Sequence, residues 1–354
     1  MRPLSVTPRG RLARRALITV TLALTCAGLL ATPADARASR VRLGSSADVG
    51  RASWGGPAYT MNGDGAVVPA SMRRAVDAIR GGSGSIDVVV LAGSAPSSGS
   101  ATPECDVVMG VGGVNSCTTW TLTRASDGND PQVNQDIRNA EFVYFAGGDQ
   151  CRYTAWKGTG LQASVQSVVA KGGGVGGGSA GTHINSSVVY DACVGSVTSG
   201  EALADPYDSY VTLTTGMFSW PHYGDTVNDS HFVARDRMGR LMAFTARAVQ
   251  DGLTTQGRAW GVGIDEGGGS LYVDAQGRGT LFGADAYVVL ADHRPEKAVA
   301  GQPLTYQRFK IWHLRPGATF DFAQRPDCGY YLRSVVAGRA DTGLYDGTPA
   351  APCA

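Results

Sequence analysis

The stretch Lys171-Gly-Gly-Gly-Val-Gly-Gly-Gly-Ser179-Ala-Gly-Thr182 holds one serine inside a run of glycines. A nucleophilic hydroxyl must stand clear of its own backbone, and a sharp strand-to-helix turn achieves this where the neighbouring residues lack side chains. A strand-like Gly-Gly-Val-Gly-Gly precedes the serine, and the residues from Ala180 to Val189 predict a helix after it. Ser179 is therefore the predicted nucleophile, with the N–H of Ala180 placed to donate to an oxyanion.

Two alternatives to a nucleophile turn apply to the same glycines. A phosphate-binding loop would continue as Gly-Lys-Ser or Gly-Lys-Thr, and no such sequence follows. A plain structural turn stays open, because a Gly-x-Ser-x-Gly match arises easily by chance in a chain with 49 glycines. The strand-turn-helix context is what favours catalysis here.

Apolar runs and helical periodicities alternate around the glycine run. Continuous apolar, β-branched segments at Ile86–Ala92 and Phe142–Ala146 predict buried strands, and each runs into glycine. Apolar residues recur at helical spacing at Met72, Val76 and Ile79 and again at Leu161, Val165, Val168 and Val169. This alternation predicts an α/β fold, in which a mostly parallel sheet is flanked by helices and carries its functional loops at the carboxyl ends of the strands.

The residue pattern of the chain changes after Gly267. Short strand-like pieces separated by glycine turns predict antiparallel structure, at Ser270–Val273, Gly279–Phe282 and Ala286–Leu290. The tail from Gln302 to Cys353 is predicted to pack on the main sheet as additional β-structure. We therefore expect one α/β domain, residues 39–300, followed by a C-terminal β extension, residues 301–354.

The first 38 residues are typical of an export signal. Five arginines precede an apolar run from Ala16 to about Ala31, and small residues follow at Ala34, Ala36 and Ala38. The Arg14-Arg15 pair leaves the twin-arginine route open beside the general secretory route. We expect a secreted protein whose mature chain begins near Ser39.

Charge and hydropathy argue against two classes of partner. The chain has 31 basic and 30 acidic residues, and the export signal contains six arginines and one aspartate, so the mature chain carries a net charge of about −4. Nucleic-acid binders more often have a basic excess, and the mature chain lacks both this excess and a cluster of lysines and arginines with interleaved aromatic residues. No second apolar run reaches the roughly 20 residues that cross a bilayer, so we expect no membrane anchoring after processing.

Six cysteines remain once the signal is removed: Cys105, Cys117, Cys151, Cys193, Cys328 and Cys353. An even number in an exported chain favours disulfides. Proximity in the sequence favours the pairs 105–117, 151–193 and 328–353 among the possible pairings. A zinc site is disfavoured because no Cys-x-x-Cys pair occurs, and nothing in the sequence requires a metal or another cofactor.

A serine nucleophile needs a general base, and the mature chain has five histidines: His183, His222, His231, His293 and His313. The twelve-residue stretch from Asp229 to Arg240 surrounds His231 with an aspartate and three arginines, Arg235, Arg237 and Arg240. So much charge is costly to bury unless it is paired or faces a cleft, which makes His231 the preferred base. His222, in Trp220-Pro-His-Tyr223, is the second choice, and its alternative interpretation is a loop residue packed against aromatics. His183 follows Ser179 by one helical turn and is too near in sequence to reach back to the hydroxyl.

An acidic side chain should orient the imidazole and stabilise its charged form. The candidates are Asp229 and the Asp265-Glu266 pair, where the strand-like Trp260–Ile264 ends before a turn. We prefer Glu266, because a carboxylate at a strand end can reach across neighbouring strands. An exposed turn acid is the alternative interpretation of Glu266.

Four blocks of the chain, taken in order, resemble the S51 family of serine peptidases, and within it cyanophycinase and its exported relatives. The blocks are Phe145-Ala-Gly-Gly-Asp-Gln150, Gly177-Gly-Ser-Ala-Gly181, Asp229-Ser-His-Phe232 with Arg235, Arg237, Gly239 and Arg240, and Gly263-Ile-Asp-Glu266. The resemblance covers roughly residues 50 to 325. It implies a fold similar to class I glutamine amidotransferases and a Ser179-His231-Glu266 triad, with oxyanion donors near Gly148 and at Ala180.

The resemblance also implies a substrate. Cyanophycinases cleave an aspartate polymer whose β-carboxyls carry arginine through isopeptide bonds, and the pocket positions here are Gln150, Asp229, Ser230, Arg235, Arg237 and Arg240. Arginines can hold the free carboxylates of a β-aspartyl-arginine unit, and Asp229 can pair with its guanidinium. The sequence departs from the family at Ser230, where a glutamine is expected, and at Gly178, where threonine is usual.

These departures leave alternatives for the ligand open. A cyanophycin-like polymer is the first expected substrate, and other acidic or isoaspartyl peptides are the second. An exported binding protein that keeps the fold without catalysis is the non-enzymatic alternative. The sequence leaves the oligomeric state open, including a homodimer.

Overall fold

The computed structural model describes residues 38–51, 53–96 and 99–353. The predicted export signal, residues 1–38, lies outside this description except for its last residue. None of the helices in the described part of the chain combines the length and the apolar character needed to span a bilayer.

The larger of the two main sheets has nine strands in the order β1-β4-β3-β5-β6-β2-β11-β12-β15. They are β1 (Ser39–Gly44), β2 (Ala58–Asn62), β3 (Ile86–Ala92), β4 (Val114–Thr121), β5 (Phe142–Phe145), β6 (Gly174–Gly178), β11 (Ser270–Val273), β12 (Arg278–Phe282) and β15 (Thr319–Asp321). The five strands from β4 to β2 run parallel. Antiparallel pairs lie at the two margins. The parallel centre confirms the fold class that the strand-helix alternation predicts.

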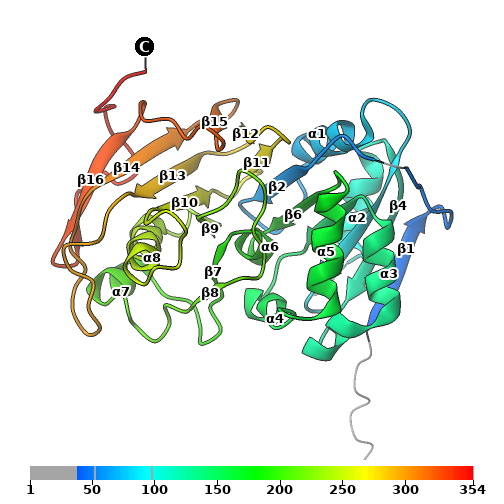
Figure 1. Ribbon diagram of the computed structural model, residues 1–354, viewed down its shortest axis with the longest axis horizontal. Helices are drawn as coiled ribbons and strands as arrows, with labels where there is room; N and C mark the ends of the chain where they lie inside the picture. Colours follow the sequence, from blue (N-terminus) through cyan, green and yellow to red (C-terminus); the bar gives the residue numbers. More distant parts are fainter. Residues whose placement is uncertain (1–37, 52, 97–98, 354) are drawn as a thin grey trace, which may run out of the picture. The chain divides into compact units, whose positions relative to one another are not determined.

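Helices cover both faces of the parallel strands (Figure 1). Helices α1 (Pro69–Arg80) and α2 (Pro103–Gly110) pack on one face, and α3 (Pro131–Asn139) and α5 (Gly160–Ala170) pack on the other. Successive side chains of a strand point to opposite faces, so in β3 Val88 and Val90 join α1 whereas Val89 and Leu91 join α3 and α5. Burial on both faces explains why β3 is a continuous apolar run in the sequence.

The second sheet has six strands in the order β17-β16-β14-β13-β10-β9. They are β9 (Thr226–Asp229), β10 (Ala259–Ile264), β13 (Ala286–Ala291), β14 (Tyr306–Leu314), β16 (Tyr331–Val336) and β17 (Arg339–Ala340). The strands after β10 pair antiparallel with their neighbours, as predicted for the chain beyond Gly267. In contrast, β9 and β10 run parallel to each other.

The C-terminal residues contribute strands to both sheets. Strand β14 pairs with β13 in the six-stranded sheet, and β15 pairs with β12 at the margin of the nine-stranded sheet. Helix α8 (Met238–Gln250) covers one face of the six-stranded sheet. The opposite face carries Trp260 and Trp312, which share a hydrophobic core with Leu271 and Phe320 of the nine-stranded sheet. The two sheets are therefore joined by a common core.

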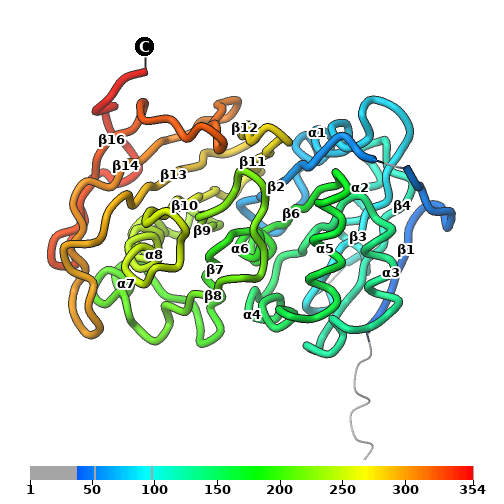
Figure 2. The backbone as a smooth tube through the Cα atoms, viewed as in Figure 1, coloured from blue at the N-terminus to red at the C-terminus, as the bar shows by residue number. Residues whose placement is uncertain are grey.

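Short elements complete the chain: the 3₁₀ turn η1 (Ala125–Asn129), α4 (Gln150–Thr154), α6 (Ala180–Ile184), α7 (Ser199–Ala204) and the two-stranded sheet of β7 (Val188–Tyr190) and β8 (Leu213–Thr215). Helix α6 contacts both β6 and β9 and lies between the two sheets (Figure 2). It ends at Ile184 rather than at the predicted Val189. The reason is that the β-branched residues Val188 and Val189 pair with β8 instead of continuing the helix.

Three disulfides occur among the described residues, and their pairing is the one that proximity favours: Cys105–Cys117, Cys151–Cys193 and Cys328–Cys353. The first ties α2 to β4, and the second ties α4 to the loop after β7. The third ties the turn before β16 to the C-terminal residues. Each closes a loop of the chain and thereby restricts the unfolded state.

Candidate active site

Ser179 occupies a strained turn between β6 and α6. Its φ of 50° and ψ of −110° are values that residues with a side chain seldom adopt. Close packing explains the glycines around it, because a Cβ atom at Gly181 would overlap the carbonyl oxygen of Phe145, and one at Gly177 would overlap the backbone of Gly181. The glycines thus allow β5, β6 and α6 to approach closely and to present Ser179 on the turn.

His231 and Glu266 come from the six-stranded sheet. Strand β9 ends at Asp229, shortly before His231, and β10 ends at Ile264, shortly before Glu266. The parallel register sets Asp229 opposite Gly263, so both strands end at the same edge of the sheet. The nucleophile and the other two predicted catalytic residues therefore belong to different sheets.

The three side chains form a continuous hydrogen-bonded chain. Ser179 Oγ lies 2.8 Å from His231 Nε2, and His231 Nδ1 lies 2.5 Å from Glu266 Oε1. An imidazole protonated at Nδ1 donates to the carboxylate and leaves Nε2 able to accept from the serine hydroxyl. The second-choice histidine, His222, is exposed and packs beside Gly277 instead.

The charges around the imidazole favour its neutral form. Burial lowers the pKa of His231, the hydrogen bond to Glu266 acts in the opposite direction, and the guanidinium groups of Arg235 and Arg237 lower the pKa further. The hydrogen bond with His231, aided by the charge of Arg235, holds the pKa of Glu266 below its usual range. The site at neutral pH therefore combines a neutral imidazole with a carboxylate, the pairing needed for a general base.

The end of β2 connects the two halves of the site. The N–H of Ser179 donates to the carbonyl of Asn62 at 3.3 Å, and the N–H of His231 donates to the carbonyl of Gly63 at 2.8 Å. A Cβ atom at Gly63 would overlap the carbonyl oxygen of Asp265, so the turn that carries Glu266 passes directly over this glycine. Residues 62 and 63 could not be identified from the sequence, because Asn-Gly after a strand is also typical of an ordinary turn.

The N–H groups of Gly148 and Ala180 are the predicted oxyanion donors. A Cβ atom at Gly147 would lie 3.8 Å from Cβ of Ser179, so the loop that carries Gly148 passes beside the serine. Ala180 follows Ser179 and is buried. Neither the N–H of Gly148 nor that of Ala180 donates to another described residue. Two backbone donors are thus left for a ligand beside Ser179.

Asp229 and Arg240 form a buried ion pair. Their exposed fractions are 0% and 2%, and Arg240 Nη2 and Nε donate to the two carboxylate oxygens at 2.6 and 2.8 Å. Burial would raise the pKa of Asp229, but the Arg240 guanidinium outweighs this effect and holds the pKa below its usual range. The sequence predicts that both residues contact substrate. In the structure their charges pair with each other, and Arg240 also lines the cleft of Arg235 and Arg237, whereas Asp229 does not.

The predicted pocket residue Ser230 is also buried. Its hydroxyl lies 3.1 Å from His183 Nε2, and its carbonyl accepts a hydrogen bond of 2.8 Å from Arg237 Nη1. Burial lowers the pKa of His183 to about 3, so that ring is neutral. Its Nδ1 has no hydrogen-bond partner among the described residues. Ser230 is 1% exposed, so it packs beneath the surface next to His231.

Two of the predicted pocket residues remain at the surface near the site. The Arg235 side chain is 53% exposed and its Nε donates to Glu266 Oε1 at 3.2 Å. Gln150, at the start of α4, is partly buried and donates from Nε2 to the carbonyl of Tyr190 at 3.3 Å. A cleft of about 380 Å³ is lined by the segments 196–200 and 235–237 and by Arg240. Burial lowers the pKa of Arg237 only to about 10, so its guanidinium is charged at neutral pH. The lining of this cleft therefore holds three arginines and one carboxylate, that of Asp236.

A second cleft lies at the loop of Gly147 and Gly148. Its volume is about 450 Å³, and Gly147, Gly148 and Glu104 line it. Burial raises the pKa of the Glu104 carboxyl, and no basic side chain counters this effect. A lone glutamate in a polar segment carries no signal in the sequence, so sequence analysis could not single it out.

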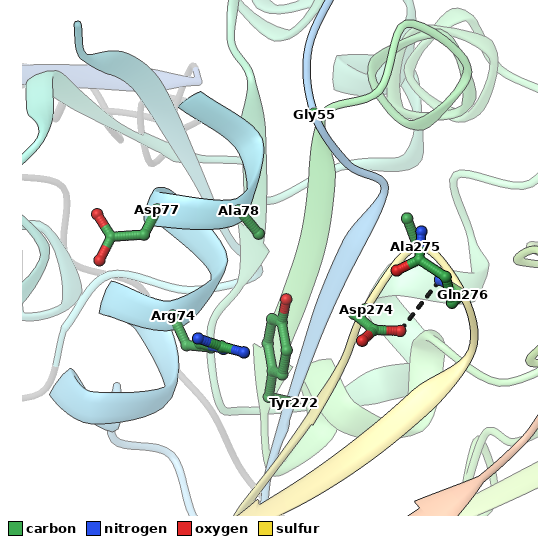
Figure 3. A pocket seen from close by; sticks show the side chains of 8 residues that line it. All are labelled: Gly55, Arg74, Asp77, Ala78, Tyr272, Asp274, Ala275 and Gln276. Atoms are coloured by element: carbon green, nitrogen blue, oxygen red, sulfur yellow. Dashed lines mark hydrogen bonds between the residues drawn. The ribbon is translucent and has the colours of Figure 1, made fainter. Parts of the chain in front are cut away.

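A third cleft, of about 320 Å³, lies away from the catalytic residues. Arg74 of α1, Tyr272 and Asp274 line it (Figure 3). Strand β11 runs antiparallel to β2, with Ser270 opposite Asn62, so Tyr272 and Asp274 lie toward the other end of β2. Asn62 marks the edge at which Ser179 is found, which places this cleft at the opposite edge of the sheet. Among the described residues, no group of three or more histidine, cysteine or acidic side chains is arranged to hold a metal ion.

Comparisons with known proteins support the fold. No model of a protein family matches the sequence, and a search of curated proteins found no match. A solved structure of a peptidase from an acI-B1 actinobacterium aligns with a TM-score of 0.52 and 14% identity, over 76% of this chain and 98% of that one. A Listeria monocytogenes EGD-e protein provisionally named peptidase E aligns over 62% of this chain and 96% of its own, with a TM-score of 0.39 and 12% identity. At 14% identity, the first similarity establishes that this chain has the fold of a peptidase.

Proposed function

We propose that this chain is an exported serine peptidase that cleaves peptide or isopeptide bonds through an acyl-enzyme. The observation that carries the proposal is the hydrogen-bonded chain from Ser179 through His231 to Glu266, which two separate sheets must cooperate to build. The strained backbone of Ser179 supports the proposal, because strained residues are costly and occur most often at active sites and ligand-binding sites. Export is supported by the sequence of residues 1–38, and three disulfides suit an oxidising compartment.

The reaction follows from these positions. The neutral imidazole of His231 takes the proton of Ser179 as Oγ attacks the carbonyl carbon, and Glu266 stabilises the resulting imidazolium. The N–H groups of Gly148 and Ala180 hold the oxyanion of the tetrahedral intermediate. His231 then gives the proton to the leaving amine, the C–N bond breaks, and an ester on Ser179 remains. Water, deprotonated by His231, hydrolyses the ester and restores the serine hydroxyl.

The charges that line two clefts, one at Arg235 and Arg237 and one at Gly148, support a substrate that carries both signs. The cleft of Arg235 and Arg237 can hold carboxylates. The cleft of Glu104 can hold a cationic side chain, because a positive charge would relieve the cost of burying this carboxylate alone. Glu104 thus replaces Asp229 as the proposed partner of a guanidinium. A β-aspartyl-arginine polymer of the cyanophycin type is the first proposed substrate, and other acidic or isoaspartyl peptides are the second.

The catalytic assignment is tested with Ser179→Ala. We expect this variant to keep its circular dichroism spectrum and melting temperature and to lose at least ~10³-fold of peptidase activity, as for removal of a triad member. A fluorophosphonate should label wild-type Ser179 and leave the variant unlabelled. Normal turnover by Ser179→Ala would reject the assignment. A folded wild-type protein that binds peptides and neither cleaves them nor reacts would favour the non-enzymatic alternative.

The substrate assignment needs a separate test. Purified mature protein is incubated with cyanophycin, and the release of β-aspartyl-arginine dipeptides is measured. Intact polymer beside cleavage of isoaspartyl or acidic peptides would transfer the assignment to the second substrate class. Glu104→Gln supplies the matched variant, since it should raise KM for arginine-bearing substrates while it leaves the rate of fluorophosphonate labelling unchanged.

A further inference from the structure

The C-terminal residues 341–353, which we call the strap, are fastened along β16. The Tyr331 hydroxyl donates to the carbonyl of Leu344 at 2.8 Å, and Arg333 Nε donates to the carbonyl of Gly343 at 3.0 Å. Further along, the N–H of Ala350 donates to the carbonyl of Tyr330 at 2.8 Å. The disulfide Cys328–Cys353 closes the far end. The strap is therefore held at both ends, with Tyr345 between the fastenings.

Tyr345 reaches from the strap to the turn that follows His231. Its hydroxyl donates to Asp236 Oδ1 at 3.0 Å and accepts from the N–H of Met238, the first residue of α8, at 3.1 Å. Its ring packs edge-on against Phe232, with centroids 6.0 Å apart, and against Tyr287, at 5.4 Å. One side chain of the strap therefore joins both ends of the segment 232–238.

The turn after His231 needs such support. His231 and Asp236 both have positive φ values, 48° and 49°, in the left-handed region that residues with side chains seldom adopt. Within the turn, the N–H of Arg237 donates to the carbonyl of Phe232 at 2.9 Å. Backbone in such conformations persists only when surrounding contacts hold it. Asp265 supplies one such contact, since its Oδ1 accepts from the N–H of Val233 at 2.9 Å. Tyr345 supplies another through Asp236 and Met238.

The chemical state of Tyr345 suits this role. The ring is partly buried, and burial raises the pKa of its hydroxyl, so the group stays protonated and able to donate. Its acceptor Asp236 and its donor Met238 lie on either side of Arg237, which donates to the carbonyl of Ser230 next to His231. Displacement of Tyr345 would thus be transmitted to the imidazole through a single turn of backbone.

We propose that Tyr345 is a positioning residue for His231, and that the strap sets the imidazole at hydrogen-bond distance from Ser179. The proposal rests on the proposed function for its effect on rate, although the placement of the imidazole can be measured without any turnover. Tyr345 touches none of the reacting atoms, and its influence passes through Phe232, Asp236 and Met238.

The test compares Tyr345→Phe with Tyr330→Phe. Tyr330 is also a partly buried tyrosine of this region, but it packs on Trp312 and lies away from the turn of His231. We expect Tyr345→Phe to slow fluorophosphonate labelling of Ser179, and kcat on a cleaved peptide, by ~10- to 100-fold with little change in KM, since small misplacements of catalytic groups have effects of this size. Tyr330→Phe should behave as wild type.

A spectroscopic readout separates this inference from the proposed function. The proton on His231 Nδ1, shared with Glu266, should give a low-field proton NMR signal in the wild type, assigned by its loss in His231→Gln. Tyr345→Phe should broaden or remove the signal, and Tyr330→Phe should retain it. The wild type could show the signal and Tyr345→Phe could lack it, while the wild type shows neither labelling nor turnover. That outcome would reject the proposed function and leave the positioning role of Tyr345 intact.

A second variant keeps the inference testable if Tyr345→Phe folds poorly. Asp236→Ala removes the hydrogen-bond acceptor and leaves the aromatic packing, and it should reproduce the loss of rate. In the double variant the two losses should not add, because both break one interaction. An unchanged signal and an unchanged labelling rate in folded Tyr345→Phe or Asp236→Ala would overturn the inference.

Discussion

The nine-stranded and six-stranded sheets contribute to the candidate site in different ways. The turn of Ser179 is shaped by backbone contacts, where glycines such as Gly181 allow carbonyl groups to approach closely. The turn of His231 is shaped by side chains, including the ion pair of Asp229 with Arg240 and the hydroxyl of Tyr345. The nucleophile side is therefore sensitive to added volume, and the histidine side is sensitive to lost charge or lost hydrogen bonds.

The two carboxylates at the ends of β9 and β10 show a related contrast. Asp229 is fully buried and makes a bidentate pair with Arg240, whereas the Glu266 side chain is 36% exposed and contacts His231 and Arg235. Of the two acids at these neighbouring strand ends, Asp229 stabilises the structure and Glu266 takes part in the proposed chemistry. Burial, rather than distance along the chain from His231, distinguishes the two.

Exchanging each carboxylate for its amide gives the largest expected difference. Asp229→Asn leaves Arg240 buried without its countercharge, and we expect the free energy of unfolding to fall by about 3–5 kcal/mol. Glu266→Gln should change it by no more than about 0.5 kcal/mol, the usual range for exposed sites. Urea unfolding followed by circular dichroism measures both. Equal losses of unfolding free energy in the two variants would contradict the contrast between the buried and the exposed carboxylate. Glu266→Gln should nonetheless lower peptidase activity by roughly 10²-fold or more, because the imidazole loses its carboxylate partner.

A methyl group added on the nucleophile side should have the next largest effect. In Gly181→Ala the new Cβ meets the carbonyl of Phe145, and the expected loss is about 1–3 kcal/mol of unfolding free energy, typical of overpacking. Gly200→Ala in α7 is the matched control, because a Cβ atom there meets nothing within 4 Å. Thermal melts of the two variants make the comparison. A Gly181→Ala protein as stable as Gly200→Ala would show that this approach of backbones is not required.

The smallest expected effect is a shift of pH dependence. Arg235 lowers the pKa of His231, so Arg235→Gln should raise that pKa and move the acid limb of labelling or of kcat/KM to higher pH. The rate rises with pH in both proteins, since the neutral imidazole is the active form. Arg339→Gln, at exposed β17, should leave the profile in place. A shift to lower pH, or none, would contradict the electrostatic role of Arg235.

Much of the fold could be predicted from local patterns. Strands β3 and β5 are buried on both faces and therefore read as continuous apolar runs. The separation into two sheets could not be predicted, because the parallel pairing of β9 with β10 joins segments on either side of α8 and depends on long-range packing. The short α6 was mispredicted because pairing of Val188 and Val189 with β8 overrode a weak helical pattern.

The site could be predicted in part for a similar reason. Few histidines and a distinctive glycine turn narrowed the choice to Ser179, His231 and Glu266, which the structure brings together. The complete burial of Asp229 was not predictable, since the same carboxylate could have faced a cleft. Tyr345 gave no signal at all, because its role depends on a tail that returns to the turn of His231 from more than a hundred residues away.

The backbone at Asn62 and Gly63 has one further consequence. The carbonyl groups of these consecutive residues accept hydrogen bonds from the N–H groups of Ser179 and His231. The nucleophile and the imidazole are therefore both bound to adjacent peptide groups, although they follow strands of different sheets. If the sheets rock against each other, alcohol and imidazole should travel as one body. Small motions of one sheet relative to the other would then leave the distance between Ser179 Oγ and His231 Nε2 nearly constant.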